Sequence, residues 1–311
     1  MTAIILRRRK LGRTSCREIA AASTTGISVV RNWRQLDLRR VTKAPRYLFR
    51  WGVTSAWEGP RRFEDGDYGS YSMEVVNTSD SIHWCSNKKQ GRLDMQAAGV
   101  PVPETWATET FLDRVESIRL DTALRQLADA FVARPATHAQ GRNLYYDTAV
   151  GLAQRLTSEL MATGYVSRLI KKVAEYRVFV CQNRVVWVAK KTPGNPEQVA
   201  WNVAQGGRFD NVRWGEWNMD VVDAALQAAR VSGTDFCGVD VMVDADGMPY
   251  VLEVNSAPSQ TSPYRQQCVA KAFDYIVRNG RQHFPNVEAE GWRDVIHPAL
   301  LGERDEVRRE A

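Results

Sequence analysis

The 311-residue chain has few of the side chains that build common metal and nucleophile sites. Its four histidines are dispersed, and its five cysteines show no Cys-x-x-Cys spacing. This argues against a zinc site or a disulfide framework, and it favours a reducing compartment, the cytoplasm. No apolar run approaches the roughly 20 residues that cross a bilayer, so we expect no membrane partner. The apolar run at residues 3–6 is followed by four basic residues, which is the wrong order for a secretory signal.

Positive charge is concentrated at the start of the chain. Residues 1–62 hold fifteen lysines and arginines against three acidic residues, a net charge of +12. The whole chain carries +6, so the remainder is close to −6. The basic segment favours an anionic partner, such as a nucleic acid, an acidic peptide or protein, or a nucleotide; a solvated arginine-rich surface explains it equally well. Arg50, Arg61 and Arg62 would suit an acidic substrate.

The first fifty residues predict a small open α/β domain. Residues 4–9, 27–33 and 46–53 have strand patterns, and residues 14–22 have a helix pattern that Thr14 or Ser15 could cap. A rival interpretation is that the region between residues 17 and 33 forms a helix-turn-helix. Together with the basic charge, that interpretation predicts nucleic-acid binding.

Residues 237–259 form the most informative stretch. Two apolar runs flank Asp-Ala-Asp-Gly at residues 244–247, which predicts a hairpin with a tight turn. With the turn centred between Ala245 and Asp246, Asp240 would lie opposite Val251. One face would then carry Asp240, Met242, Val251, Glu253 and Asn255, and the other Val239, Val241, Val243, Tyr250, Leu252 and Val254. Two close carboxylates repel each other unless a cation lies between them, and carboxylate and amide oxygens are ligands that Mg²⁺ accepts. The alternative is a solvated face of an edge hairpin.

The residues of this hairpin resemble a known family. Gly-Val-Asp at residues 238–240 and Leu-Glu-Val-Asn-Ser-Ala-Pro at residues 252–258 resemble the metal-binding end of ATP-grasp ligases. The similarity is greatest to RimK-type enzymes and to related ATP-grasp proteins of bacteriophages. The resemblance implies that Asp240, Glu253 and Asn255 hold Mg²⁺, or Mn²⁺ in its place, against the phosphates of ATP.

Other segments extend the resemblance to most of residues 75–265. Asn87-Lys88, a helix pattern and Gly-Val-Pro-Val-Pro-Glu-Thr at residues 99–105 are similar to the entry of the ATP-grasp domain, which implies that Lys88 reaches the ATP phosphates. Arg134 stands where the family has a lysine over the nucleotide, and the loop after it keeps only Gly141 of the usual glycines. Arginine can still neutralise phosphate, but a loop with few glycines lets fewer backbone N–H groups approach it.

A second predicted hairpin carries further residues of the resemblance. Glu-Tyr-Arg-Val-Phe-Val at residues 175–180, a turn, and a strand ending in Lys190-Lys191 resemble the ATP-grasp proteins closely; the alternative is the exposed end of a two-stranded ribbon. The nucleotide-binding residues that the resemblance implies are Ser167, Arg168, Leu169, Ile170 and Lys172 around the adenine, Glu175 near the ribose, and Asn202 near phosphate and metal. The implied catalytic residues are Arg177 with Lys190 or Lys191, facing phosphates or an acyl-phosphate.

These patterns together predict an α/β (α+β) protein of ATP-grasp fold. We expect a basic N-terminal α/β (pre-ATP-grasp) domain at residues 1–85, a small ATP-grasp subdomain at 86–165, a C-terminal subdomain with the metal hairpin at 166–283, and a tail at 284–311. The expected activity is an ATP- and Mg²⁺-dependent ligase that activates a carboxylate as an acyl-phosphate for attack by an amine, with amino acids or peptides as substrates. The alternatives are a nucleic-acid-binding protein, a nucleotide-binding pseudo-enzyme, and a kinase acting on a substrate other than a carboxylate.

Overall fold

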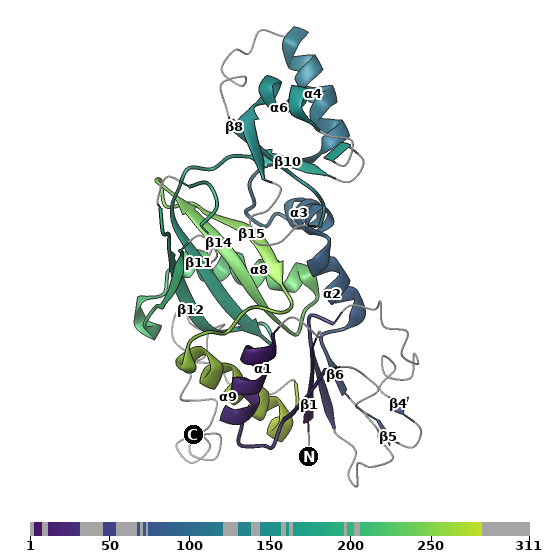
Figure 1. The fold of residues 1–311 in the computed structure, drawn as a ribbon, viewed down its shortest axis with the longest axis vertical. Helices are drawn as coiled ribbons and strands as arrows, with labels where there is room; N and C mark the ends of the chain where they lie inside the picture. The colour runs from purple at the N-terminus through teal and green to yellow at the C-terminus, as the bar shows by residue number, and fades with distance from the viewer. Residues whose placement is uncertain are drawn as a thin grey trace.

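Three larger sheets follow one another along the long axis of the molecule (Figure 1). The structure is a computed structural model, and it describes residues 3–7, 12–31, 46–53, 67–68, 71–72, 74–120, 130–137, 144–156, 160–161, 164–195, 198–201 and 206–281. No helix in these ranges is long and apolar enough to cross a bilayer.

The N-terminal sheet is parallel, with strand order β2-β1-β3-β6. This confirms the open α/β arrangement, and it contradicts the helix-turn-helix because the segment after Gly26 is a strand paired with β1. The predicted cap is also wrong: the first helix starts at Arg13, and the Ser15 hydroxyl instead accepts a hydrogen bond from Gln260 N at 2.9 Å. The elements are β1 (Ala3–Arg7), α1 (Arg13–Ala22), β2 (Ser28–Val30), β3 (Tyr47–Trp51), β4 (Asp67–Tyr68), β5 (Tyr71–Ser72) and β6 (Glu74–Val76).

The second sheet is antiparallel, with strand order β7-β10-β8-β9. Two helices precede it in the chain, and Asn87 ends the first and caps the second. The helix that follows β9 ends at Arg155, because Leu156 has an extended backbone. The elements are α2 (Ser79–Ser86), α3 (Lys88–Ala97), β7 (Thr105–Ala107), α4 (Thr108–Leu120), β8 (Ala130–Arg134), β9 (Tyr145–Thr148), α6 (Ala149–Arg155) and β10 (Tyr165–Arg168). The expected boundary at residue 165 therefore falls inside β10, and we propose to place it after Arg168.

The third sheet is antiparallel, with strand order β13-β12-β11-β14-β15. Its β11–β12 hairpin turns at Gln182 and Asn183, whose φ angles of 50° and 57° suit a tight hairpin turn. The elements are β11 (Lys172–Cys181), β12 (Arg184–Thr192), β13 (Arg208–Asn211), the 3₁₀ turn η5 (Trp214–Glu216), α8 (Met219–Ser232), β14 (Phe236–Asp244), β15 (Pro249–Asn255) and α9 (Pro263–Asn279).

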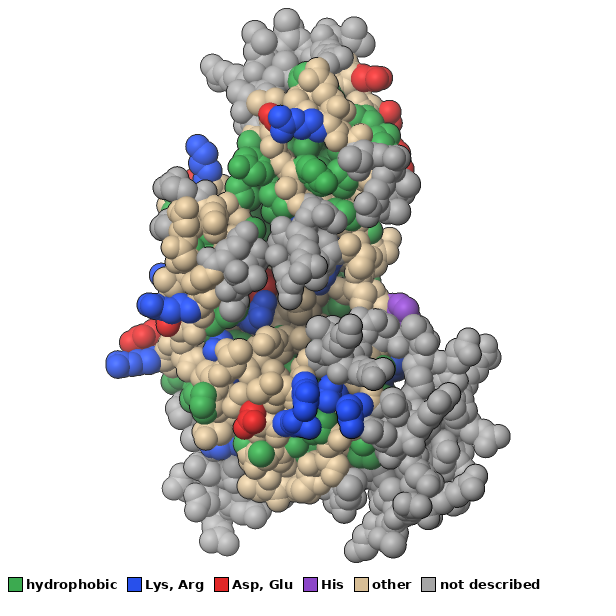
Figure 2. Space-filling model, viewed as in Figure 1, with side chains coloured by type: hydrophobic (Ala, Val, Ile, Leu, Met, Phe, Trp, Pro, Cys, Tyr) green, Lys and Arg blue, Asp and Glu red, His purple; other side chains and the backbone are tan. Residues whose placement is uncertain are grey.

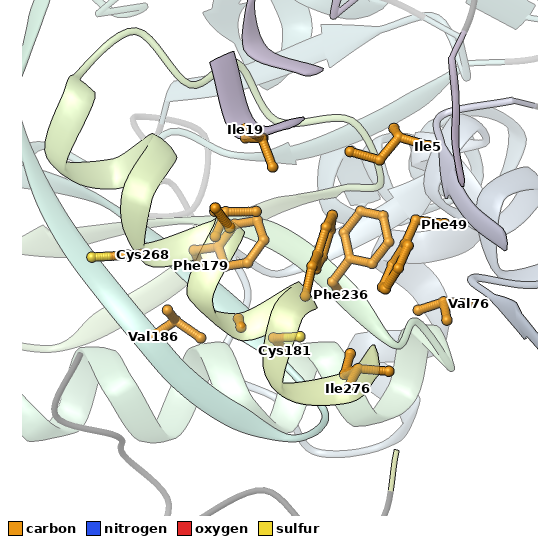
Figure 3. Close-up of a cluster of buried hydrophobic side chains, with 14 of the residues drawn as sticks. Ile5, Ile19, Phe49, Val76, Phe179, Cys181, Val186, Phe236, Cys268 and Ile276 are labelled. Atoms are coloured by element: carbon orange, nitrogen blue, oxygen red, sulfur yellow. The ribbon is translucent and has the colours of Figure 1, made fainter. Parts of the chain in front are cut away.

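The two faces of the third sheet pack against different parts of the molecule. On one face, valines of β11, β14 and β15 pack against α8 and against Met95 of α3. On the other face, Phe179 and Phe236 pack against Phe273 of α9 and Phe49 of the N-terminal sheet (Figure 3). Phe49 and Phe273 stack with ring centroids 4.1 Å apart. The aromatic core around Phe49 and Phe273 joins the N-terminal sheet to one end of the third sheet. Beyond this core, the same face of the third sheet continues toward the second sheet.

The β14–β15 hairpin has a different register from the one expected. A bulge next to Asp240 shifts the pairing, so that Asp240 lies opposite Glu253 and Val241 lies opposite Val251. Leu252 is the extra residue of the bulge, because it has no partner in β14. The side chains of Val251 and Val254 can therefore both pack in the core under α8, while Leu252 is partly exposed on the opposite side. The prediction that Val251 shares the acidic face was therefore wrong.

Candidate active site

A cavity of about 840 Å³ lies between the second and third sheets. Figure 2 shows basic and acidic side chains close together in the hollow between the upper and middle parts of the molecule. The cavity is walled by β8 and β10 on one side, by β11, β12, β14 and β15 on the other, and by the loops before β13 and after β15. Of the residues implicated by the sequence, it brings together Arg134, Ser167, Arg168, Leu169, Ile170, Lys172, Glu175, Arg177, Lys191, Asp240 and Glu253.

The linker between β10 and β11 forms one end of this cavity. The Arg168 N–H donates to the Glu104 carbonyl at 2.9 Å, and the Leu169 N–H donates to the Ala130 carbonyl at 2.8 Å. These bonds fix the linker to β8 and to the segment before β7. Ser167 is buried, and Arg168 forms a half-exposed ion pair with Glu104 at 3.5 Å. The linker is therefore held by its backbone, and its Leu169 and Ile170 side chains line the cavity.

A carboxylate held between two ammonium groups lies next to the linker. Glu175 of β11 accepts hydrogen bonds from Lys172 and from Lys191 of β12, and each of the three side chains is no more than 9% exposed. Burial lowers the pKa of Lys172, while Glu175 acts in the opposite direction. Lys172 also lies 4.6 Å from the ring centroid of Trp201. One negative and two positive charges leave this group with an excess positive charge.

A second ion pair lies further along β11. Arg177 donates to Asp240 of β14 through two parallel hydrogen bonds, Nε to Oδ1 at 2.6 Å and Nη2 to Oδ2 at 2.7 Å. The two residues are direct neighbours in the β11–β14 pairing. Burial would lower the pKa of Arg177, but the paired Asp240 outweighs it and the pKa is raised. Arg177 therefore remains a guanidinium cation at any physiological pH, and it also lies over the Phe209 ring at 4.7 Å.

The β14–β15 hairpin carries the residues expected to bind metal. Asp240 and Glu253 face each other across the two strands, and the Asn255 Nδ2 donates to a Glu253 oxygen at 2.9 Å. Lys88 approaches this group from α3, at 3.2 Å from Asn255 Oδ1 and 3.4 Å from Glu253 Oε2. Two carboxylates and an amide oxygen in one cluster fit a hard divalent cation. No group of three or more His, Cys, Asp or Glu side chains suited to a metal occurs in the described part of the chain, so Asn255 is needed to complete the set.

The charge of the cavity wall favours an anion. Seven lining side chains are basic and three are acidic, so the wall carries a formal net charge of +4. The acidic side chains are Glu175, Asp240 and Glu253, and each of them contacts a lysine or an arginine. Partial burial of these charges strengthens their attraction for an anion. A polyphosphate is a ligand of the right charge.

Some residues implicated by the sequence do not line the cavity. Lys190 is exposed on the face of β12 opposite to Lys191. Lys88 borders a smaller hollow beside Glu253. Arg50 is buried and donates to Ser79 Oγ at 2.9 Å and to the Val53 carbonyl at 3.1 Å, so it stabilises the N-terminal sheet. Asn202, Arg61, Arg62 and Gly141 lie outside the described residues.

The structure adds cavity residues that the sequence did not predict. Arg92, Trp201 and Phe209 line the wall together with Tyr165. Arg92 follows Lys88 by one helical turn, and this i, i+4 spacing in α3 was the signal that could have identified it. Trp201 and Phe209 gave no such signal, because Trp201 lies in a loop and Phe209 in the short edge strand β13, neither with a periodic pattern.

Comparison with known families shows to which family the chain belongs. Residues 86–274 match the model of an ATP-grasp domain family. The chain belongs to the ATP-grasp family. The matched residues include both cavity-forming sheets and the β14–β15 hairpin. The expected ATP-grasp fold is confirmed.

Several similar proteins are named as alpha-L-glutamate ligases. A probable alpha-L-glutamate ligase of Saccharophagus degradans is 37% identical over 225 residues, which are 70% of this chain and 71% of that protein. The tetrahydromethanopterin:alpha-L-glutamate ligase of Methanocaldococcus jannaschii is 27% identical over 65% of this chain and 69% of its own length. A probable alpha-L-glutamate ligase of Vibrio parahaemolyticus matches over 39% of its length. The expectation of an ATP-grasp ligase that joins a carboxylate to an amine is confirmed.

Solved ATP-grasp structures share the fold at low identity. The D-alanine–D-alanine ligase of Bacillus anthracis gives a TM-score of 0.62 at 15% identity, covering 90% of this chain and 97% of that one. A D-cycloserine synthetase gives a TM-score of 0.60 at 16% identity, covering 89% of this chain and all of the other. Both alignments extend well beyond the length of the ATP-grasp domain match.

Proposed function

We propose that this ATP-grasp enzyme binds ATP with Mg²⁺ in the cavity and ligates an amino-acid or peptide carboxylate to an amine, with L-glutamate as one of its two substrates. The observation that carries the proposal is the convergence in one cavity of a backbone-held linker, three ion-paired cations and the paired carboxylates of the hairpin. L-Glutamate is proposed because the relatives at 37% and 27% identity are named for it.

The linker and β11 give the nucleotide its direction in the cavity. Leu169 and Ile170 offer apolar contact and backbone groups for the base, and Lys172 follows them directly. Arg177 lies five residues further along β11, which is about 16 Å at 3.3 Å per residue. We propose that the base lies at the linker, the phosphates beside Lys172 and Lys191, and the transferred phosphoryl group near Arg177.

The reaction then needs positioning and positive charge more than a strong base. A substrate carboxylate oxygen attacks the γ-phosphorus of ATP, the bond to the β-phosphate oxygen breaks, and ADP leaves. The amine nitrogen next attacks the acyl carbon, and inorganic phosphate leaves. Arg177 and Lys191 are fixed by Asp240 and Glu175, so they are already oriented when charge develops on the phosphoryl oxygens.

The metal ligands of the proposal are Asp240, Glu253 and Asn255. A divalent cation held there supplies charge neutralisation to the phosphates. Arg177 contacts Asp240, and Lys88 contacts Glu253. These two positive charges offset the repulsion between the two neighbouring carboxylates. Replacing either acid should therefore weaken nucleotide binding in the presence of Mg²⁺ more than in its absence.

The choice between Lys190 and Lys191 gives a matched pair of variants. Lys191 is buried at the cavity wall, whereas its neighbour Lys190 is exposed on the other face of the same strand. We expect K191Q to lower kcat at least 100-fold and K190Q to leave it within twofold, because only Lys191 can contact a bound phosphate. Steady-state ADP release measures both, and equal losses in the two variants would contradict the assignment.

Transfer of isotope tests the reaction itself. The enzyme is incubated with Mg·ATP, an amine screen that includes amino acids and short acidic peptides, and L-glutamate carrying ¹⁸O in its carboxylates. Activation through an acyl-phosphate moves one ¹⁸O into the released inorganic phosphate for each new C–N bond. Product formation with unlabelled phosphate would show that L-glutamate supplies the amine, and unlabelled phosphate from both acids, each labelled in turn, would contradict the mechanism. The converse experiment carries the ¹⁸O in the carboxylate of the second substrate, and labelled phosphate from that acid alone would reject L-glutamate as the activated acid and keep the mechanism.

A further inference from the structure

Three basic side chains lie over one aromatic ring at the cavity wall. Phe209 of the edge strand β13 is half-buried, lines the cavity and pairs directly with Lys191 of β12. Its ring centroid lies 4.7 Å from Arg177 Cζ, 5.5 Å from Lys191 Nζ and 5.7 Å from Arg265 Cζ. All three distances are within the roughly 6 Å at which the face of a ring attracts a cation. The proposed mechanism does not yet give this ring a task.

Arg177 and Lys191 are the two cations that the proposed mechanism places at the transferred phosphoryl group. A carboxylate holds each of them: Asp240 pairs with Arg177, and Glu175 pairs with Lys191. A lysine ammonium is a point charge on a flexible stem, so one ion pair leaves it several orientations. The Phe209 ring gives both cations a second contact, and that contact comes from a different strand.

Arg265 of α9 is the third cation, and in the described ranges it forms no ion pair with a carboxylate. The residue is 3% exposed, and its Nη2 donates to Thr261 Oγ1 at 3.3 Å. It also lies over the Trp187 ring, at 5.4 Å. Burial lowers the pKa of Arg265 and the charge of Arg177 lowers it further, while Asp210 acts in the opposite direction. Arg177 and Arg265 therefore repel each other, and the two aromatic rings supply attraction that offsets this repulsion.

We propose that Phe209 is a positioning residue, whose ring orients Arg177 and Lys191 for phosphoryl transfer and offsets the repulsion from Arg265. The face of a ring attracts a cation without neutralising it, so both cations keep their full charge for the phosphoryl oxygens. A carboxylate in place of the ring would neutralise one of them and repel the phosphates of the nucleotide. The inference rests on the proposed function, because the ring has this task only if a phosphoryl group is transferred beside these cations.

Fluorination of the ring tests this contact directly. Each fluorine withdraws electron density from the ring face and weakens its attraction for a cation, while the size of the ring changes little. Phe209 is replaced by mono-, di- and trifluorophenylalanine in the full chain, and by leucine in F209L. Steady-state ADP release is measured with Mg·ATP, L-glutamate and the amine screen described above. We expect kcat to fall with each added fluorine, at least threefold for the trifluoro ring and at least fivefold for F209L, with the KM for ATP within twofold.

Phe111 provides the matched control for the chemical change. It is 2% exposed and packs against Phe131 and Trp106 in the core of the second sheet, away from the cavity. Among the described residues, no lysine or arginine lies over its ring. The same three fluorinated residues at position 111 should therefore leave kcat within twofold of the wild type.

Three results would overturn the inference. They are a kcat that does not change along the fluorinated series at Phe209, an equal loss at Phe111, and a loss confined to the KM for ATP. The fluorinated proteins keep the volume of the ring, so they decide the question if F209L does not fold. Absence of ADP release in the wild type would instead remove the proposed function itself.

Urea unfolding of the same proteins separates these two failures, because it needs no activity. Fluorine makes a ring more apolar, so a ring at position 209 that only packs should keep or gain stability along the series. A ring that holds three cations should lose stability with each fluorine. Stability that stays constant or rises would contradict the contact, whatever the outcome for ADP release.

Discussion

Replacing Glu175 by glutamine should destabilise the protein strongly, because Glu175 is the counter-ion of two buried lysines. Lys172 and Lys191 both donate to it, and their side chains are each 9% exposed. Removing one partner of a buried ion pair costs about 3–5 kcal/mol, since the remaining charge stays buried without compensation. Here two ammonium groups would remain, so we expect a loss of at least ~3 kcal/mol, or roughly 5 °C or more in Tm.

The assay is urea unfolding of E175Q and of the control E216Q. Glu216 forms a surface ion pair with Arg213 at 3.9 Å and is 63% exposed, so its replacement should change stability by less than about 0.5 kcal/mol. A loss below ~1 kcal/mol in E175Q, or equal losses in the two variants, would refute the idea that Glu175 balances a buried double charge.

The same variant has a predicted pH dependence. Burial already holds the pKa of Lys172 below its ordinary value of 10.5, and removal of Glu175 takes away the interaction that raises it. The unfolded chain then binds more protons than the native one between the folded pKa and 10.5, so stability rises with pH in that window. The unfolding free energy of E175Q should rise with pH more steeply than that of the wild type. A parallel pH profile would contradict this.

Two further predictions concern packing and acid stability. In Gly238→Ala the new Cβ would lie 2.6 Å from Pro258 Cβ, so we expect a loss of about 1–3 kcal/mol by urea unfolding, against less than ~0.5 kcal/mol for Gly215→Ala, which faces open space. For Asp274, burial raises the pKa, but hydrogen bonds from residues 23–25 outweigh it and the pKa is lowered below 3.8. Its stabilisation is therefore present above pH 3.8 and lost as the pH falls through the folded pKa: D274N should be about 2 kcal/mol less stable at pH 7, and the difference should shrink below pH 3.8.

Residue identity and spacing in the sequence identified most of the residues that the structure brings together at the cavity, and their roles stay predictions. Asp240 and Glu253 were placed on one face of a hairpin, and they do face each other. Their register was predicted wrongly, since a β-bulge adds one residue without disturbing the apolar alternation on either side of it. The choice between Lys190 and Lys191 stayed open for a related reason: which of two adjacent strand residues faces the cavity depends on pairing with β11, which the sequence does not show.

Other features depended on contacts between distant segments. α2 was not predicted because Ser79–Ser86 has little apolar periodicity; Ile82 and Cys85 are its two buried apolar side chains. Ser15 was expected to cap its own helix, yet it bonds to Gln260, 245 residues away. The two relatives with the longest matches described above come from cellular organisms, so the similarity to bacteriophage proteins stays a prediction.

The most direct test of the account is thermal unfolding with ATP, with and without Mg²⁺, for the wild type and Glu253→Gln. A ligand at about 100 times its Kd adds roughly 2.7 kcal/mol to the stability of the state that binds it. The account predicts that ATP raises the Tm of the wild type by several degrees more when Mg²⁺ is present, and that E253Q loses this Mg²⁺-dependent part. No stabilisation of the wild type by Mg·ATP, or an undiminished Mg²⁺ effect in E253Q, would contradict it.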